Sequence, residues 1–104
     1  MRARYSAFVM GETRFLLETT HPDYVRTKPD PARWRAEVEA TVRDVRFTHL
    51  AVLQEHSEGD RGEVRFVATM RRGALEKEIG EDSSFVREGG RWYYHAGETF
   101  VPQR

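Results

Sequence analysis

The chain has 104 residues, 38% hydrophobic and 33% charged, which is enough for one globular domain and too little for two. Its 17 basic and 17 acidic side chains cancel, so no overall field attracts nucleic acid or an anionic membrane, and cysteine is absent, which excludes disulfides and thiolate metal sites. With no apolar run of the roughly 20 residues that cross a bilayer and no signal peptide, we expect one cytoplasmic domain over residues 1–104.

Two short helices are predicted at the start of the chain. Residues 2–10 place apolar side chains at helical spacing, and Gly11 is a typical helix stop. Residues 15–17 form the apolar stripe of a second helix. This helix must end near His21, because Pro22 disfavours helical geometry in the residue before it.

A connecting loop and a third helix follow. Residues 22–31 contain three prolines, which predicts a loop. Asp30 is a good helix cap and the proline after it fits a first turn, so we expect a helix that runs to about Asp44. This helix has a single apolar stripe, which consists of Trp34, Val38 and Val42. We expect the stripe to face a sheet.

From Val45 onward the hydrophobic period is two, which predicts antiparallel strands. The four predicted strands span residues 45–56, 63–71, 75–88 and 91–100. Arg72-Gly73 and Gly89-Gly90 are interpreted as two-residue turns, the first of which places Met70 opposite Leu75. The predicted fold class is therefore α+β, with three N-terminal helices packed on a strongly curved four-stranded antiparallel sheet.

The turn at Gly89-Gly90 fixes the pairing of the last two strands. Counting back from it places Tyr94 opposite Phe85 and Phe100 opposite Ile79. One face of the sheet then collects the large apolar side chains, which are Phe66, Met70, Leu75, Ile79, Phe85, Trp92, Tyr94 and Phe100. We expect the helices to cover this face.

The same face carries polar groups, and Glu81 falls opposite Glu98 in this register. Two facing carboxylates repel, and burial raises the pKa of one of them further. A carboxyl group with a raised pKa suits general acid–base catalysis, with His21 or Tyr5 as hydrogen-bond donor to a substrate. The alternative is that both carboxylates are solvated at a strand end.

The histidines give no clear site. His21 either acts as a base oriented by Asp23 or caps the end of the second helix, where a positive charge is favoured. His95 shares the parity of Tyr93, which predicts the outer face of the sheet. Because no two histidines have helical ligand spacing, we expect no metal site and no cofactor.

The leading functional hypothesis is a module that binds a small, partly apolar ligand between helices and sheet. The expected ligand-binding residues are Tyr5, Trp34, Ser83, Phe85 and Tyr94. The alternative is that the aromatic residues of this set only form the structural core.

A second hypothesis is a protein-interaction module, such as a homodimer formed through the outer face of the sheet. That face would carry Val67, Val86, Tyr93 and His95.

Two segments resemble the middle domain of the bacterial YchJ family, which has a cone-shaped fold like nuclear transport factor 2. They are Arg2-Ala3-Arg4-Tyr5-Ser6-Ala7-Phe8-Val9 and Phe85-Val86-Arg87-Glu88-Gly89-Gly90-Arg91-Trp92-Tyr93-Tyr94, with Gly11 and His21-Pro22 between them. Thr20 stands where the family has tryptophan. The resemblance implies a pocket but no reaction, because similar folds include isomerases, dehydratases and hydrolases as well as pure binding modules. Members usually carry cysteine-rich SEC-C zinc motifs, which this sequence lacks.

Overall fold

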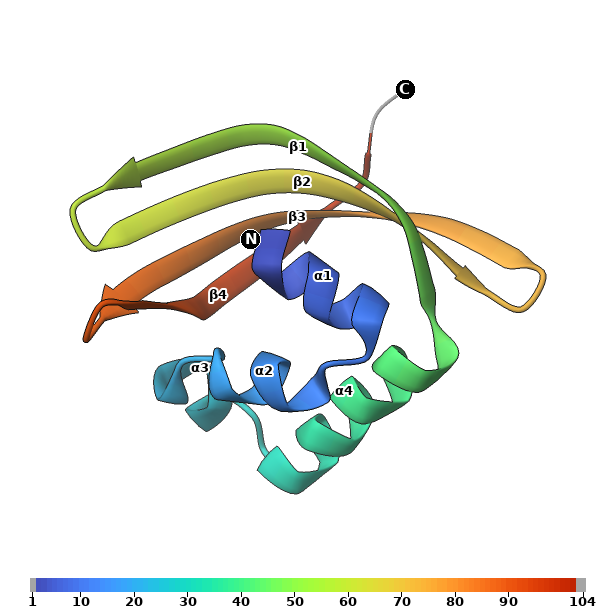
Figure 1. Ribbon diagram of the computed structural model, residues 1–104, viewed down its shortest axis with the longest axis horizontal. Helices are drawn as coiled ribbons and strands as arrows, with labels where there is room; N and C mark the ends of the chain where they lie inside the picture. The colour runs from blue at the N-terminus through green and yellow to red at the C-terminus, as the bar shows by residue number, and fades with distance from the viewer. Residues whose placement is uncertain (1, 103–104) are drawn as a thin grey trace.

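Helices occupy the first half of the chain and strands the second (Figure 1). The computed structural model describes residues 2–102. Its helices are α1 (Arg2–Met10), α2 (Thr13–Glu18), α3 (Pro22–Arg26) and α4 (Pro31–Asp44). Its strands are β1 (Arg46–Glu58), β2 (Arg61–Arg72), β3 (Leu75–Glu88) and β4 (Arg91–Phe100). The strands bend over the helices, which lie against one face of the sheet (Figure 1).

The helix α3 is a correction to the predicted loop at residues 22–31. Proline at the first helical position costs no hydrogen bond, because that N–H has no partner within a helix. His21 caps the helix, since its Nδ1 accepts a hydrogen bond of 3.0 Å from the backbone N–H of Asp23. The three prolines therefore flank a short helix rather than prevent one, and the described chain has four helices instead of three.

The other predicted helix limits agree with the structure. Gly11 follows α1 with a positive φ of 74°, a conformation that glycine adopts without strain. Asp30 caps α4, because its Oδ1 accepts a hydrogen bond of 3.2 Å from the backbone N–H of Arg33. None of the helices in the described part of the chain is both long and apolar enough to cross a membrane.

The sheet has the strand order β1-β2-β3-β4, and all neighbours are antiparallel. The predicted turn between β2 and β3 is displaced, because Arg72 pairs with Leu75 and Gly73 opens the loop with a φ of 60°. Met70 therefore pairs with Lys77 and not with Leu75. The displacement is two residues along the partner strand, so the apolar side chains of β2 and β3 keep the predicted face.

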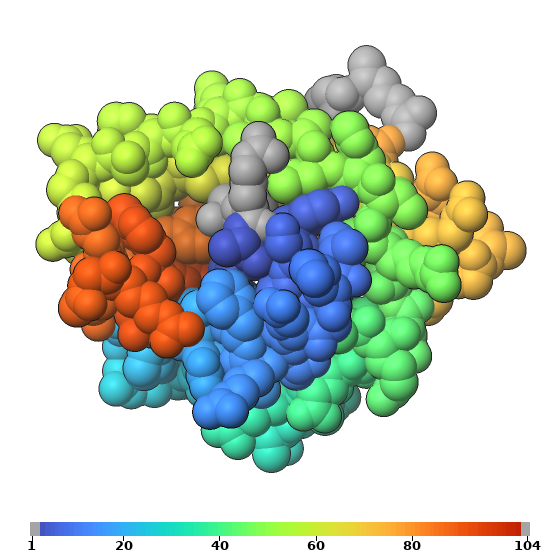
Figure 2. Space-filling view, in the orientation of Figure 1, coloured from blue at the N-terminus to red at the C-terminus, as the bar shows by residue number. Residues whose placement is uncertain are grey.

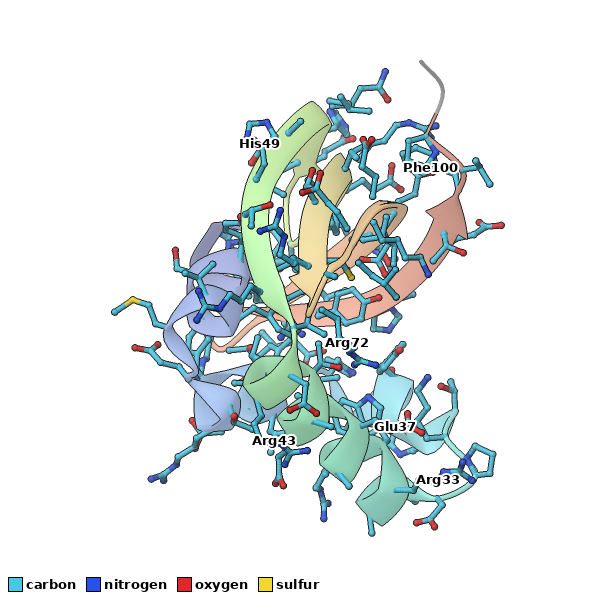
Figure 3. The ribbon with its side chains drawn as sticks, turned by 90° about the vertical axis from the view of Figure 1, so that its right-hand side faces the viewer. Arg33, Glu37, Arg43, His49, Arg72 and Phe100 are labelled. Atoms are coloured by element: carbon cyan, nitrogen blue, oxygen red, sulfur yellow. The ribbon has the colours of Figure 1, made fainter. Side chains whose placement is uncertain are left out.

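The pairing of β3 with β4 is as predicted near the turn and differs beyond it. Tyr94 pairs with Phe85, but Ser84 then pairs with Ala96, so one extra residue, His95, forms a bulge. Beyond the bulge every side chain of β4 changes face. Phe100 consequently pairs with Gly80 rather than Ile79 and lies on the outer face, at the end of the sheet far from α4 (Figure 3).

The packed core lies at the middle of β2 and β3. Its buried members are Val64, Phe66, Ala68 and Phe85, and partly buried side chains of β1, β3 and β4 pack against it. Leu75 and Trp92 belong to the same face but are 75% and 37% exposed. Both residues lie at hairpin ends, where the strands extend beyond the helices (Figure 1).

Candidate functional site

A cavity of about 440 Å³ separates the helices from the sheet. All five predicted ligand-binding residues line it: Tyr5, Trp34, Ser83, Phe85 and Tyr94. Most of the remaining wall is apolar and comes from α1, α4 and the three strands β1 to β3. The structure therefore brings together residues that lie up to 89 positions apart in the sequence, and it leaves space between them.

One end of the cavity wall is polar, and Glu81 is at its centre. The carboxylate of Glu81 accepts a hydrogen bond of 2.8 Å from the hydroxyl of Tyr94 and another of 2.8 Å from Ser83. Burial and the neighbouring carboxylate raise the pKa of the Tyr94 hydroxyl far above its ordinary value. The phenol therefore keeps its proton and remains a donor to Glu81.

Arg4 from α1 lies beside this group. Its guanidinium donates to the hydroxyl of Thr19 at 2.7 Å and to the carbonyl of Leu16 at 3.2 Å, and it lies 5.0 Å from the centre of the Tyr94 ring. Burial lowers the pKa of Arg4, while the nearby Tyr94 and Glu81 oppose this change. The cavity wall thus holds a cation from α1 beside an anion from β3, and Arg72 at the end of β2 adds a second cation.

Arg4 also lines a second hollow, of about 510 Å³, between the first two helices and the ends of the strands. Figure 2 shows this side of the molecule as a depression between blue α1 and the orange hairpin of β3 and β4. A third hollow of about 830 Å³ is lined by strand residues alone. We take the first cavity as the candidate site, because helices and sheet both wall it and a group of hydrogen-bonded polar side chains lines it.

Gly97 leaves room for the polar end of the cavity. A Cβ atom at this position would collide with the hydroxyl of Tyr94 and the carboxylate of Glu81. The contact between Tyr94 and Glu81 therefore depends on glycine at this position of β4. Sequence reasoning missed Gly97, although an isolated glycine inside a strand is the usual signal of such a close approach.

The predicted pair of Glu81 and Glu98 is wrong. Glu98 pairs with Asp82, and Glu81 pairs with Thr99, because the bulge at His95 moves Glu98 to the outer face. Among the described residues that line the cavity, Glu81 is the one carboxylate. Two carboxyl groups that share a proton, on which the acid–base hypothesis depended, are therefore not present in the cavity wall.

His21 lies outside the cavity wall, at the free edge of β4. Its N–H donates to the carbonyl of Tyr94 at 2.8 Å, and the N–H of Tyr94 donates to the carbonyl of Thr19 at 2.7 Å. The Nε2 atom of His21 lies 2.9 Å from Glu88. The predicted cap at the end of α2 by a positive charge is therefore wrong, because His21 caps the start of α3 as a hydrogen-bond acceptor.

His95 lies against His21 rather than in open solvent. Their ring centres are 5.1 Å apart, and the side chain of His95 is 34% exposed. Asp23 completes the group, because its Oδ2 lies 3.6 Å from Nδ1 of His21 and 3.5 Å from Nε2 of His95. Sequence spacing gave no sign of this arrangement, which results from the bulge in β4 and the start of α3.

Comparison with known proteins identifies the family of this chain. The family described as "YchJ, middle NTF2-like domain" matches residues 1–97. A UPF0225 protein of Bordetella pertussis is 37% identical over 99 residues, which cover 94% of this chain and 68% of the relative. A UPF0225 protein of Sodalis glossinidius is 41% identical over an alignment 112 positions long, and the alignment covers 100% of this chain and 67% of the relative.

Two solved structures share the fold. The SEC-C motif containing protein RPA3114 of Rhodopseudomonas palustris has a TM-score of 0.79 and 34% identity, and the match covers 97% of this chain and 76% of that protein. A SEC-C motif containing protein of Psychrobacter arcticus has a TM-score of 0.70 at 20% identity, and the match covers 100% of this chain and 60% of that protein. The extent of these matches and the predicted resemblance agree: the chain belongs to the YchJ family, as its middle domain with a fold like that of nuclear transport factor 2.

Proposed function

We propose that this domain binds a small, partly apolar ligand in the cavity between α4 and the sheet. The observation that carries the proposal is the composition of the cavity wall. Aromatic and aliphatic side chains make up most of the wall around about 440 Å³, and the polar groups of Arg4, Glu81 and Tyr94 lie together in it. A wall that is mostly apolar, with a few convergent polar groups, is the usual composition of a ligand site.

The polar end favours ligands that offer both a donor and an acceptor. Glu81 already accepts hydrogen bonds from Tyr94 and Ser83, and its carboxylate has capacity for more. Arg4 supplies donors beside it. A ring compound that fits the cavity would place its ring against Trp34, and a hydroxyl group would donate to Glu81 whereas a carbonyl group would accept from Arg4.

The two tryptophans of the chain provide the test. Trp34 lines the cavity, whereas Trp92 lies at the hairpin of β3 and β4 and lines the second hollow. Protein labelled with fluorotryptophan gives one fluorine signal for each, and Trp92→Phe assigns them. We expect hydroxylated and carbonyl-bearing ring compounds to move the Trp34 signal and to leave the Trp92 signal in place. Equal movement of both signals, or movement of neither across such a collection, would reject the proposal.

The outer face of the sheet supports a second candidate function, an interaction with another protein chain. Val86 and Tyr93 are cross-strand partners on this face, as predicted. Tyr93 also packs against His21, with 6.0 Å between ring centres, and Arg65 and Asp82 form an ion pair of 2.7 Å further along. Light scattering at high protein concentration distinguishes the two states: a dimer that Val86→Asp dissociates supports this function, and a monomer contradicts the homodimer.

A further inference from the structure

The group of His21, Asp23 and His95 lies at the free edge of β4, apart from the ligand cavity. Each of the three residues offers one ligand atom, and these atoms lie within 4.8 Å of one another. We infer that they form a site for one divalent ion of the zinc class, with an open position for water. The group combines two imidazole nitrogens and one carboxylate oxygen, a set of donors that zinc prefers.

The distances match the size of such a site. Zinc binds nitrogen and oxygen ligands at about 2.0–2.2 Å, so two donors in a tetrahedral site lie about 3.3–3.5 Å apart. The Oδ2 atom of Asp23 lies 3.6 Å from His21 and 3.5 Å from His95. The two imidazoles need only a further approach to each other, and the ring of His95 is partly exposed.

The tautomer of His21 is already the one that a metal ion requires. The backbone N–H of Asp23 donates to Nδ1, so this nitrogen carries a lone pair and no proton. The proton is then on Nε2, which lies 2.9 Å from the carboxylate of Glu88. A ligating histidine whose second nitrogen donates to a carboxylate is the common arrangement around metal ions, because it fixes the ring and raises its basicity.

Asp23 has one oxygen free for the ion. Arg26 pairs with its Oδ1, while its Oδ2 faces the two histidines. Binding at Nδ1 of His21 replaces the hydrogen bond from the Asp23 N–H, so the ion competes with the cap of α3. We therefore expect zinc to shift the backbone signals of the first turn of α3 together with those of the bulge at His95.

The experiment uses the full chain without an affinity tag, treated with a chelator and titrated with zinc sulfate against a chromophoric indicator. Imidazole nitrogen shifts are recorded in parallel. We expect one equivalent of zinc, with shifts at His21 and His95 and none at His49 or His56. His95→Ala should weaken binding at least about tenfold, since even the loss of a residue behind a ligand has that effect.

His49→Ala is the matched control, because His49 is exposed on β1, the edge strand of the sheet opposite to β4 (Figure 3). It should bind zinc as the unaltered chain does. Asp23→Asn and His95→Gln give the same test with smaller changes in shape, and circular dichroism without zinc verifies their folding. The inference is overturned if no imidazole signal moves at millimolar zinc, if His49 and His56 respond instead, or if folded His95 variants keep full affinity.

Discussion

The centre of the sheet and the longest helix are packed differently. At the centre of β2 and β3, Ala68 is 1% exposed and Val64 and Phe85 are each 7% exposed. The longest helix, α4, has no buried residue, and its apolar side chains border the cavity instead. Helices α1 and α2 are also well packed, since Ala7 and Leu16 are each 1% exposed, so the wall made by α4 is the one that leaves space for a ligand.

This difference predicts unequal costs for removing an aromatic ring from each side. Phe85→Ala deletes a ring from the packed core and should reduce the free energy of unfolding by about 3–5 kcal/mol. Trp34→Ala should cost less than half as much, because Trp34 is only half-buried in the folded state. Urea unfolding measures both values, with the dependence on urea concentration as a check on two-state behaviour. Equal losses would contradict the comparison.

A second prediction concerns close packing at the polar end of the cavity. Gly97→Ala inserts a methyl group against Tyr94 and Glu81 and should cost about 1–3 kcal/mol of stability. Gly62→Ala is the control, since a Cβ there meets Trp92 at an ordinary 3.5 Å. The control should change stability by about 1 kcal/mol or less in either direction. Thermal unfolding of the two variants gives the comparison, and a loss in the control as large as that of Gly97→Ala would contradict it.

The sequence was sufficient to predict the strands and the inner face near the turns. The alternation of β2 and β3 and the turn at Gly89-Gly90 placed Phe85 opposite Tyr94, as the structure has them. The position of Glu98 could not be predicted, because one extra residue at His95 reverses every later side chain and the hydrophobic pattern of β4 ends there.

The limits of the helix prediction have a different cause. Pro22 was interpreted as the start of a loop, yet proline is equally suited to the first turn of a helix. The choice depends on His21, whose N–H donates a hydrogen bond to the carbonyl of Tyr94, 73 residues further along the chain. The five cavity residues were predictable from their faces, whereas the group around His95 depends on this long-range contact.

A third prediction uses the Tyr94 hydroxyl, which connects β4 to the polar end of the cavity. Tyr94→Phe removes its hydrogen bond to Glu81 and should cost about 1–2 kcal/mol at neutral pH. The pKa of Tyr94 is raised in the folded state, so its stabilising effect is fully present below the unfolded pKa of about 10.

This stabilising effect decreases as the pH rises above 10, because the unfolded chain then releases a proton that the folded chain keeps. The slope is at most about 1.4 kcal/mol per pH unit, reduced by solvent at the partly exposed ring. Urea unfolding between pH 9 and pH 11 should therefore show a steeper loss for the unaltered chain than for Tyr94→Phe. Parallel curves would show that the ionisation of Tyr94 does not affect folding.

The smallest expected effect is on the helix side, at the cap of α4. Asp30→Ala removes the acceptor for the Arg33 N–H and should cost about 0.5–1 kcal/mol, whereas Asp30→Asn keeps a cap and most of the stability. Trp34 follows this first turn directly, and its own N–H donates to the carbonyl of Asp30 at 3.1 Å. Loss of the cap should therefore loosen the cavity wall without affecting the sheet. Hydrogen exchange should become faster at the start of α4 and remain unchanged in β2 and β3, because local opening of a weakly packed element does not require global unfolding. If exchange in the two strands became faster to the same extent, helix and sheet would unfold as one unit, and the distinction between them would concern packing alone.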